Sequence, residues 1–300
     1  MIRSMYSGVS GMKINQTKMD VIANNISNVS TTAFKSSRVR FEDLFSYTMA
    51  GAQAPTDVGR GGINPKQVGQ GANISAVDTI FDEGSLQPTG RDLDFAIEGN
   101  GFFLVSEDAD CQIIRYTRDG AFYKDYDGNL VTAGGLRVVG FGVNSPTGEI
   151  YTTDMNEIND ANGTPVLTTI RIPDVIDVGG VELRLQSFTV DTLGLISAVY
   201  DDGQIYYFGR VALANFANPG GLSKLGNNTY AATNNSGMPQ IGNPGQAGLG
   251  IIRQSNLEMS NVDLANEFTE MIITSRAYQA NSRIITTSDE MLHDLVNLKR

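Results

Sequence analysis

An apolar or aromatic residue recurs every seven positions near the end of the chain. The repeat consists of Leu257, Leu264, Met271, Tyr278, Ile285 and Leu292. A spacing of seven keeps one narrow stripe of a helix facing a partner helix, because two turns of a supercoiled helix hold seven residues. No Gly or Pro interrupts residues 251–300. The pattern predicts a long helix that pairs as a coiled coil, with Phe268 and Leu295 widening its stripe.

Polar residues mark the expected ends of this helix. The Ser260 hydroxyl is suited to accept a free backbone N–H, and Asp263 three positions later places a carboxylate in the positive first turn. Lys299 and Arg300 suit the negative end. The helix is therefore expected to begin near Ser260, within a terminal segment of 255–300.

The first 30 residues carry a second stripe with the same spacing, within an expected terminal segment of 1–35. Its members and the residues that widen it are Met5, Val9, Met12, Met19, Ile22, Ala23 and Ile26. Gly8 and Gly11 each weaken a helix by about 1 kcal/mol relative to Ala, so we expect fraying near the start. Residues 1–40 hold six basic groups against one acid, whereas 251–300 hold five basic and seven acidic groups. The two helices are therefore plausible partners, although two separate amphipathic helices packed on a central domain remain the alternative.

Between the two ends the pattern is that of β-strands. Short runs rich in Val, Ile, Phe, Tyr and Thr alternate with turn pairs such as Asp119-Gly120, Asp127-Gly128 and Asp202-Gly203. The expected strands are 74–81, 93–97, 101–106, 113–117, 136–141, 167–172, 181–191, 195–200 and 205–216. Such spacing without helical segments favours an antiparallel sheet, sandwich or irregular barrel.

Gly, Asn and Pro concentrate in 49–72 and again in 218–250, which are read as connecting segments. The predicted fold class is α+β and multidomain. Its parts are a discontinuous helical domain of 1–35 and 255–300, an extended arm of 36–72, and a β-rich domain of 73–254.

Composition excludes several classes of protein. The net charge of -11 argues against nucleic-acid binding, because phosphate contacts require a basic face. No apolar run is long enough for a transmembrane helix, and the start lacks the apolar core of a cleavable secretory signal. By default this predicts a cytoplasmic chain without membrane insertion. The single cysteine, Cys111, allows no internal disulfide.

Catalytic and metal-binding patterns are not recognised in the sequence. The only histidine, His293, lies in the predicted terminal helix, far along the chain from Cys111. Asp125, Asp127 and Asn129 alternate as in a calcium loop, but Gly128 is misplaced and a closing Glu is missing, so a hairpin turn is the better interpretation. No catalytic residue, cofactor or metal is therefore expected.

The apolar stripes point to self-assembly. Ile272, Ile273, Ile284 and Val296 lie beside the stripe of the terminal helix, and a single pair of helices leaves such residues uncovered. Exposed apolar faces call for further partners. Repetition of one contact that does not close produces a helical filament, so the sequence favours a homopolymeric tube.

At both ends the sequence resembles a known family. The opening SGMKINQTKMDVIANNISNVSTTAFK (10–35) is similar to the N-terminal signature of bacterial flagellar axial proteins, the rod and hook family. LEMSNVDLANEFTEMIITSRAYQANSRIITTSDEMLHDLVNLKR (257–300) resembles its C-terminal signature, and the blocks 84–105, 116–135 and 211–237 match as well. Only 143–181 is poorly matched, and we expect a loop or small elaboration there.

This resemblance implies a structural subunit of the flagellum rather than an enzyme. Such a subunit is exported through the type III apparatus without a cleaved signal, so its site would be the extracellular hook or basal body. Segment 60–90 is similar to hook members, which favours a subunit of the flexible hook that joins rod and filament. Rod proteins, hook-filament junction proteins and the hook cap are then expected partners. A distal rod subunit is the alternative, and an acidic β-domain that binds a ligand or metal is a remote one.

Overall fold

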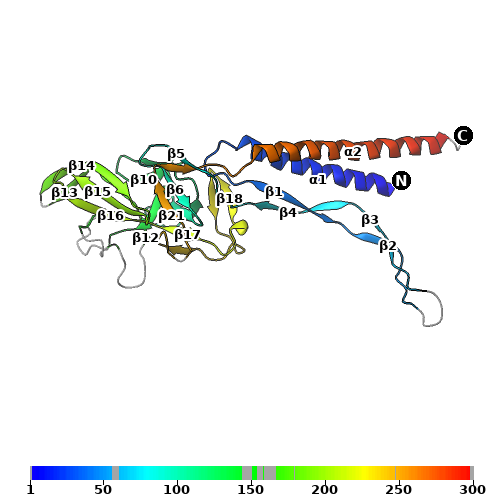
Figure 1. Ribbon diagram of the computed structural model, residues 1–300, viewed down its shortest axis with the longest axis horizontal. Helices are drawn as coiled ribbons and strands as arrows, with labels where there is room; N and C mark the ends of the chain where they lie inside the picture. Colours follow the sequence, from blue (N-terminus) through cyan, green and yellow to red (C-terminus); the bar gives the residue numbers. More distant parts are fainter. Residues whose placement is uncertain are drawn as a thin grey trace. The chain divides into compact units, whose positions relative to one another are not determined.

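Two compact units make up the chain. The computed structural model describes residues 2–55, 61–143, 151–153, 158, 167–178, 180–246 and 248–297, and Figure 1 shows the element order. The first unit, here called the helical unit, comprises Met1–Val29, Lys35–Ile80 and Val262–Arg300. The second, the β unit, comprises Ser30–Phe34 and Phe81–Asn261. No helix in the described part is long and apolar enough to cross a membrane.

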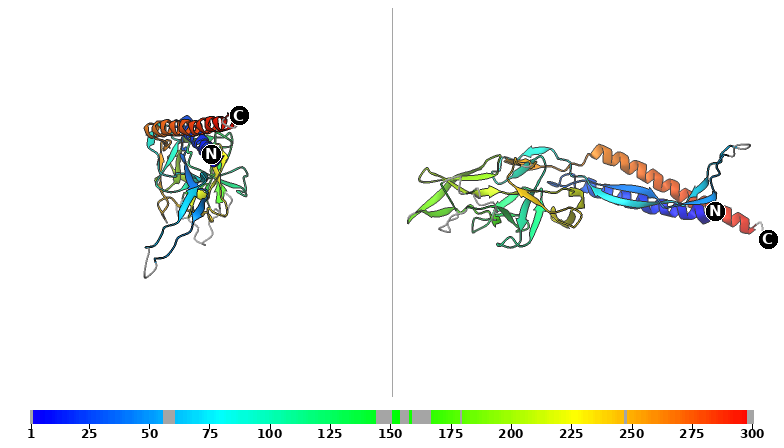
Figure 2. Two further views of the ribbon diagram at one scale, coloured as in Figure 1. Left: turned by 90° about the vertical axis from the view of Figure 1, so that its right-hand side faces the viewer. Right: turned by 90° about the horizontal axis from the view of Figure 1, so that it is seen from below.

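The helical unit contains two helices and two β-ribbons. Helix α1 (Ile2–Ser27) and helix α2 (Leu264–Asn297) lie side by side and antiparallel (Figures 1 and 2). Strands β1 (Ser37–Asp43) and β4 (Ala72–Thr79) pair antiparallel, with Ser37 opposite Thr79, and both contact α1. Strands β2 (Ser46–Ala50) and β3 (Lys66–Gly69) form the second ribbon.

The expected start of the terminal helix is wrong by about one turn. Helix α2 begins at Leu264 and not near Ser260. Leu257 instead lies in strand β22 (Asn256–Glu258), where it pairs with Gln87 of β5 (Leu86–Pro88). Its backbone hydrogen bonds are therefore made to a neighbouring strand, a long-range contact that a local repeat cannot reveal. The expected basic cap at Lys299 and Arg300 lies outside the described residues.

Segment 36–72, predicted as an extended arm, is organised as strands where it is described. It holds β1, β2 and β3, and its partner β4 belongs to the helical unit rather than to the β unit. The side chains of β2 and β3 are exposed throughout, which explains why the burial pattern of a strand is missing from this part of the sequence.

The β unit is built from antiparallel strands. Its largest sheet in the described residues has the order β13-β14-β15-β16-β11-β7-β8-β19-β18, with β9, β10, β12, β17 and β20 paired off this path. Strands β6 and β21 form a further pair, as do β5 and β22. The bounds of the strands not yet given are as follows: β6 Phe95–Glu98, β7 Phe102–Ser106, β8 Ile114–Thr117, β9 Phe122–Lys124, β10 Leu130–Thr132, β11 Arg137–Phe141, β12 Leu167–Thr169, β13 Val175–Val178, β14 Val181–Val190, β15 Leu195–Tyr200, β16 Ile205–Val211, β17 Leu213–Asn215, β18 Ser223–Gly226, β19 Thr229–Ala231, β20 Gln240–Gly242 and β21 Ile251–Gln254.

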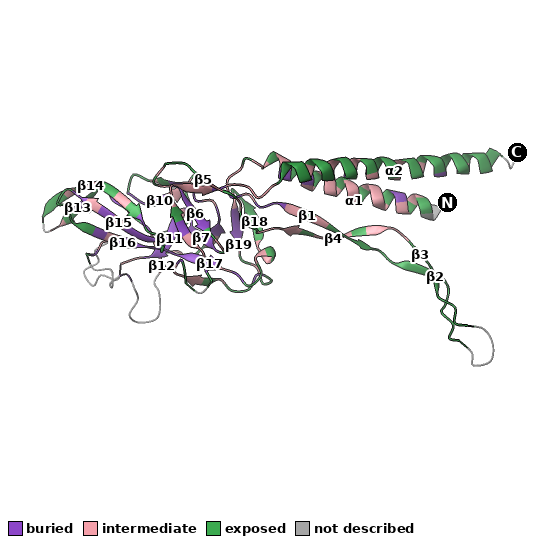
Figure 3. Ribbon diagram, viewed as in Figure 1, coloured by how far each residue is buried: buried purple, intermediate pink, exposed green. Residues whose placement is uncertain are grey.

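Strand β7 is buried on both faces. Phe103 belongs to one hydrophobic cluster with Phe95 and Phe122, whereas Phe102 and Leu104 belong to another on the opposite face. A strand covered on both sides has a continuous apolar run rather than alternation, which accounts for the sequence Phe-Phe-Leu-Val-Ser. Figure 3 shows this buried centre of the β unit.

The expected strands are largely present in the described residues. The predicted strand 205–216 is divided into β16 and β17 at Ala212, and the connecting segment 218–250 contains β18, β19 and β20. Most of 143–166, within the poorly matched segment, lies outside the described residues. The expected turn glycines Gly128 and Gly203 have φ of 85° and 73°. Gly120 instead permits close approach of the backbone, since an added Cβ would lie 1.7 Å from the Phe95 carbonyl oxygen.

Candidate assembly surfaces of the helical unit

Asp263 caps helix α2. Its Oδ1 accepts a hydrogen bond from the backbone N–H of Ala265 at 2.9 Å, and its Oδ2 accepts one from the Asn266 amide at 2.8 Å. Glu267 adds a second carboxylate in the first turn. Both negative charges complement the exposed N–H groups at the start of the helix. The sequence analysis placed Asp263 in the first turn and assigned the cap to Ser260, whereas the structure makes Asp263 the cap and Glu267 the first-turn acid.

Polar side chains connect α1 to α2. The Lys18 ammonium and the Glu270 carboxylate form an ion pair at 2.5 Å, which agrees with the charge complementarity expected from the sequence. The Asn25 amide donates a hydrogen bond to Glu267 Oε1 at 2.9 Å. The Asn25 side chain is only 1% exposed. These contacts, and not the apolar repeat alone, hold the two helices at this end.

Two glycines of α1 lie close to side chains of α2. A Cβ added to Gly11 would lie 2.7 Å from Asn281 Nδ2, and one added to Gly8 would lie 3.2 Å from Ile285 Cγ1. Helix α1 runs through both positions from Ile2. The glycines that predict local fraying therefore also permit close packing against α2.

The predicted stripe residues fall into three groups in the structure. Ile22 is buried; Met5, Met12, Met19, Ile26, Met271, Ile285 and Leu292 are partly buried; Val9, Ala23, Leu264, Phe268, Tyr278 and Leu295 are exposed. The two buried residues of α2 are instead Thr274 and Ser288. The apolar repeat therefore missed the polar residues that α2 buries, although Thr274 and Ser288 are themselves separated by a multiple of seven.

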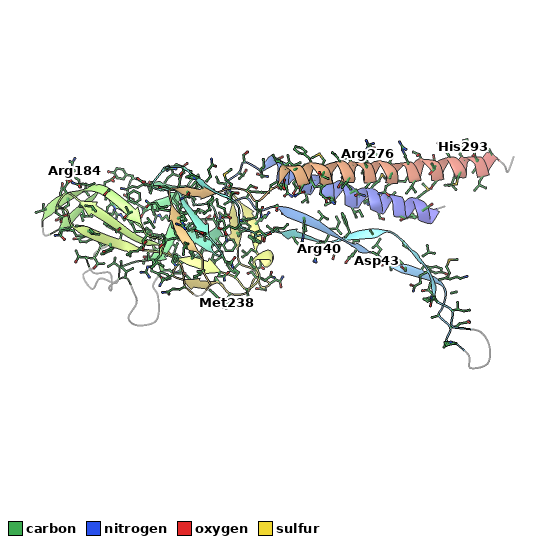
Figure 4. All side chains as sticks on the ribbon, viewed as in Figure 1. Arg40, Asp43, Arg184, Met238, Arg276 and His293 are labelled. Atoms are coloured by element: carbon green, nitrogen blue, oxygen red, sulfur yellow. The ribbon has the colours of Figure 1, made fainter. Side chains whose placement is uncertain are left out.

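Large apolar side chains remain exposed along α2, on more than one face of the helix, and are together called the apolar row. These residues are Phe268, Ile272, Ile273, Ile284, Met291, Leu295 and Val296, and Ile272 is 63% exposed. Figure 3 shows that α2 is exposed along most of its length, and Figure 4 marks Arg276 and His293 on the same helix. Large apolar side chains that stay exposed in this number along one helix are typical of a surface that associates with other protein.

The ribbon of β2 and β3 is a second exposed apolar surface. Phe45, Tyr47, Met49 and Val68 are between 47% and 68% exposed. The backbone of the ribbon is paired within itself in the register Tyr47 to Val68. Its outer strand edges are accordingly available to other protein.

Burial perturbs one acid at the helix contact. The pKa of Glu267 is raised, chiefly because the carboxylate is desolvated, while the Asn25 hydrogen bond and Lys18 oppose that rise. The nearby carboxylates of Glu270 and Asp263 act in the same direction as burial. Glu267 is thus an acid whose charged form is disfavoured where the helices meet.

Within the described ranges, no group of three or more His, Cys, Asp or Glu side chains is placed to hold a metal ion. His293 Nδ1 lies 3.0 Å from the Asn297 amide nitrogen on the exposed side of α2. The loop of Asp125 and Asp127 closes the β9–β10 hairpin, with Gly128 N–H donating to the Asp125 carbonyl at 2.9 Å.

An antiparallel helix pair that keeps a row of large apolar side chains exposed defines a subunit suited to association with other protein. Three family profiles match this chain: flagella basal body rod protein over 5–35, flagellar hook protein FlgE/F/G D1 domain over 96–148, and flagellar basal body rod FlgEFG protein C-terminal over 253–298.

Full-length relatives agree with these profiles. The chain is 44% identical to the flagellar basal-body rod protein FlgG of Bacillus subtilis and 36% identical to that of Borreliella burgdorferi, with all of each chain covered. It is 32% identical to the flagellar hook protein FlgE of B. burgdorferi, again over the whole of both chains. The chain belongs to the flagellar rod and hook protein family, whose members are structural proteins of the flagellum.

Proposed function

We propose that this chain is a rod subunit of the flagellar basal body. The observation that carries the proposal is its 44% identity to the B. subtilis rod protein over 301 aligned positions and all of both chains. The B. burgdorferi rod protein aligns over 302 positions. Rod relatives therefore match this chain in length as well as in sequence.

The hook relatives differ from this chain in length. The alignment with the B. burgdorferi hook protein extends over 445 positions, although this chain has 300 residues. That hook protein consequently carries long segments without a counterpart here. The preference for the hook that we drew from segment 60–90 is reversed by these relatives, and the rod, which was the alternative, is the better supported assignment.

A hook subunit is the second candidate. Full-length similarity to two hook proteins, at 32% and 30% identity, favours it. Both candidates share one mechanism, in which copies of the chain polymerise into a helical tube.

In this mechanism α1 and α2 form a coiled-coil core element, and the exposed apolar row of α2 is buried against other copies. Full burial of such a side chain contributes about 1.5–3 kcal/mol relative to exposure. Because these side chains are already partly covered in the single chain, each contributes less than this, and several together drive assembly. The helices would form the inner tube domain, the β unit an outer domain, and the paired strands after Lys35 a strap between neighbouring copies. Neighbouring rod, hook, cap and junction proteins and the type III export apparatus are the expected partners, which places the subunit outside the cytoplasm after export.

Complementation separates the two candidates. The gene should restore motility to a B. subtilis strain that lacks its rod protein FlgG, and it should not do so in a strain that lacks its hook protein. The purified chain should form straight tubes in electron micrographs. Curved, bendable tubes together with rescue of the hook-deficient strain would overturn the rod assignment in favour of the hook.

A further inference from the structure

A second repeat of seven runs through the contact between α1 and α2, and its members are polar or small. On α1 they are Ser4, Gly11, Lys18 and Asn25; on α2 they are Glu267, Thr274, Asn281 and Ser288. Because the helices are antiparallel, each step of seven along α1 is matched by a step of seven back along α2. We call the resulting four levels of the helix contact the polar ladder.

The two ends of the polar ladder are hydrogen-bonded. Ser4 Oγ lies 3.5 Å from Ser288 Oγ, and the Asn25 amide donates to Glu267 at 2.9 Å. The Asn25 side chain also exchanges two hydrogen bonds with the backbone of Ser37 in β1. Its donors and its acceptor are thereby engaged from two directions, which fixes the position of the amide.

The two inner levels depend on shape and burial. Asn281 fills the space beside Gly11, where no side chain larger than hydrogen fits without movement. At the next level Lys18 reaches Glu270, and Thr274 is 1% exposed, with no hydrogen-bond partner for its hydroxyl among the described residues. A buried hydroxyl without a partner lowers stability. The presence of Thr274 is therefore not explained by its contribution to packing alone.

Apolar levels alternate with the polar ones. Ile285 approaches Gly8 between the Ser4 and Gly11 levels. If the contact consisted of apolar layers alone, α1 could shift by seven residues along α2 with almost no change in packing, because each layer resembles the next. Polar layers do not, because a shift by seven places Asn281 opposite Lys18 or Ser4 instead of Gly11 and separates Asn25 from Glu267. Buried polar residues in helix pairs are known to specify alignment at the expense of stability.

We propose that the polar ladder is an alignment code: it directs α1 to α2 of the same chain in this one register and leaves the exposed apolar row of α2 to other copies. The intrachain contact then depends on hydrogen bonds and shape, and the interchain contact on apolar burial. Only this assignment of the apolar row rests on the proposed function. The register itself is a property of the single chain.

Disulfide trapping tests the register in the full-length chain. With Cys111→Ser removing the native thiol, the pair Ser4→Cys and Ser288→Cys reports the observed alignment. The pair Ser4→Cys and Asn281→Cys reports a displacement by seven residues. After oxidation, intrachain and interchain disulfides are separated by gel mobility and identified by peptide mass. We expect the first pair to form the intrachain bond about tenfold more than the second, a preference of about 1.4 kcal/mol.

The ladder is then altered with minimal change of shape. Asn25→Asp replaces a donor by a carboxylate facing Glu267, and we expect the selectivity between the two cysteine pairs to fall to near unity. Adding Glu267→Gln restores a donor opposite the new carboxylate and should recover part of the selectivity, because the Ser37 carbonyl still lacks the donor that Asn25 supplied. Rescue by exchange of donor and acceptor is not expected if Asn25 merely supports folding. Far-UV circular dichroism verifies that both variants keep their helices.

An outer-face control separates this proposal from the proposed function. Ile272→Ser should weaken polymerisation and leave the ratio of the two cysteine pairs unchanged. Equal oxidation of both pairs with Asn25 and Glu267 unaltered, predominance of interchain disulfides, or an unchanged ratio in Asn25→Asp would each overturn the alignment code. None of these readouts requires the chain to polymerise, so a failed rod assignment would be recognised separately.

Discussion

Arg118 and Glu258 form an ion pair inside the β unit with side-chain exposures of 3% and 0%. Arg118 Nη1 lies 3.2 Å from Glu258 Oε2, and Arg118 Nη2 donates to the Gly99 carbonyl at 2.7 Å. Glu258 also accepts a hydrogen bond from the Gly84 backbone N–H. The pair thereby connects β22, immediately before the terminal helical segment, to two loops of the β unit.

Removal of Arg118 should strongly destabilise the β unit. Arg118→Ala breaks the buried ion pair with Glu258, and breaking a buried pair by removal of one partner typically costs about 3–5 kcal/mol. Urea denaturation followed by tyrosine fluorescence measures the loss. The matched control is Arg253→Ala, which breaks an ion pair with Glu98 whose side chains are 49% and 45% exposed and should cost about 0–1 kcal/mol. Equal losses in the two variants would contradict the importance assigned to burial.

Charge placed on the apolar row of α2 should block assembly. Ile272→Asp replaces an exposed isoleucine by a carboxylate that polymerisation would bury, and an unpaired buried charge is strongly unfavourable. Sedimentation should detect no polymer, while the melting transition of the β unit stays unchanged. Ile272→Val, which keeps the surface apolar, should assemble normally. Polymers of normal yield from Ile272→Asp would exclude this surface from the subunit contact.

Acidification should stabilise the helix pair through Glu267. Its pKa in the folded chain is raised above the usual 4.5 by burial, so the folded state binds the proton more tightly than the unfolded state. Stability from this group is therefore present at low pH and decreases as pH rises through the folded pKa. Helix stability is measured by circular dichroism in urea from pH 4.5 to 7.5, and Glu267→Gln should flatten the dependence. If the pH dependence of helix stability is unchanged in Glu267→Gln, that dependence arises from other acids.

Removal of each of the two buried hydroxyls of α2 should change the stability of the helix pair, in opposite directions. Thr274→Val removes a hydroxyl without a partner among the described residues and should stabilise the helix pair by about 1 kcal/mol. Ser288→Ala removes the hydrogen bond from Ser288 Oγ to the Ile284 carbonyl at 2.7 Å and the contact with Ser4, and should destabilise it by a similar amount. Amide hydrogen exchange in α2 provides the measurement. Loss of protection in Thr274→Val would indicate a bond that its hydroxyl makes in solution.

Much of the secondary structure is readable from the sequence. The spacing of seven locates α1 and α2, and the apolar run of 101–106 predicts the strand β7. The boundary at Leu257 was not predictable, because its strand exists only through pairing with β5, where Gln87 lies opposite Leu257 although the two are far apart in the sequence. The ribbon of β2 and β3 escaped detection for a related reason, since exposed strands lack an apolar pattern.

The candidate assembly surface was predicted only in part. Ile272, Ile273 and Val296 were expected on the outside of the helix and are exposed there. Thr274, Asn281 and Glu267 were not selected, because a search for apolar repeats passes over polar residues with the same spacing. Their role depends on the level at which α1 meets α2, which local sequence does not contain.

By itself the sequence determined that both ends of the chain form helices and that the middle forms antiparallel strands, because residue spacing fixes which side chains share a face. The tertiary structure decided which of those faces meet. It placed Asn25 against Glu267 and Asn281 against Gly11, and it left Ile272 uncovered. The physical reason is that hydrogen-bond geometry and close approach select one alignment among the several that the repeat of seven allows.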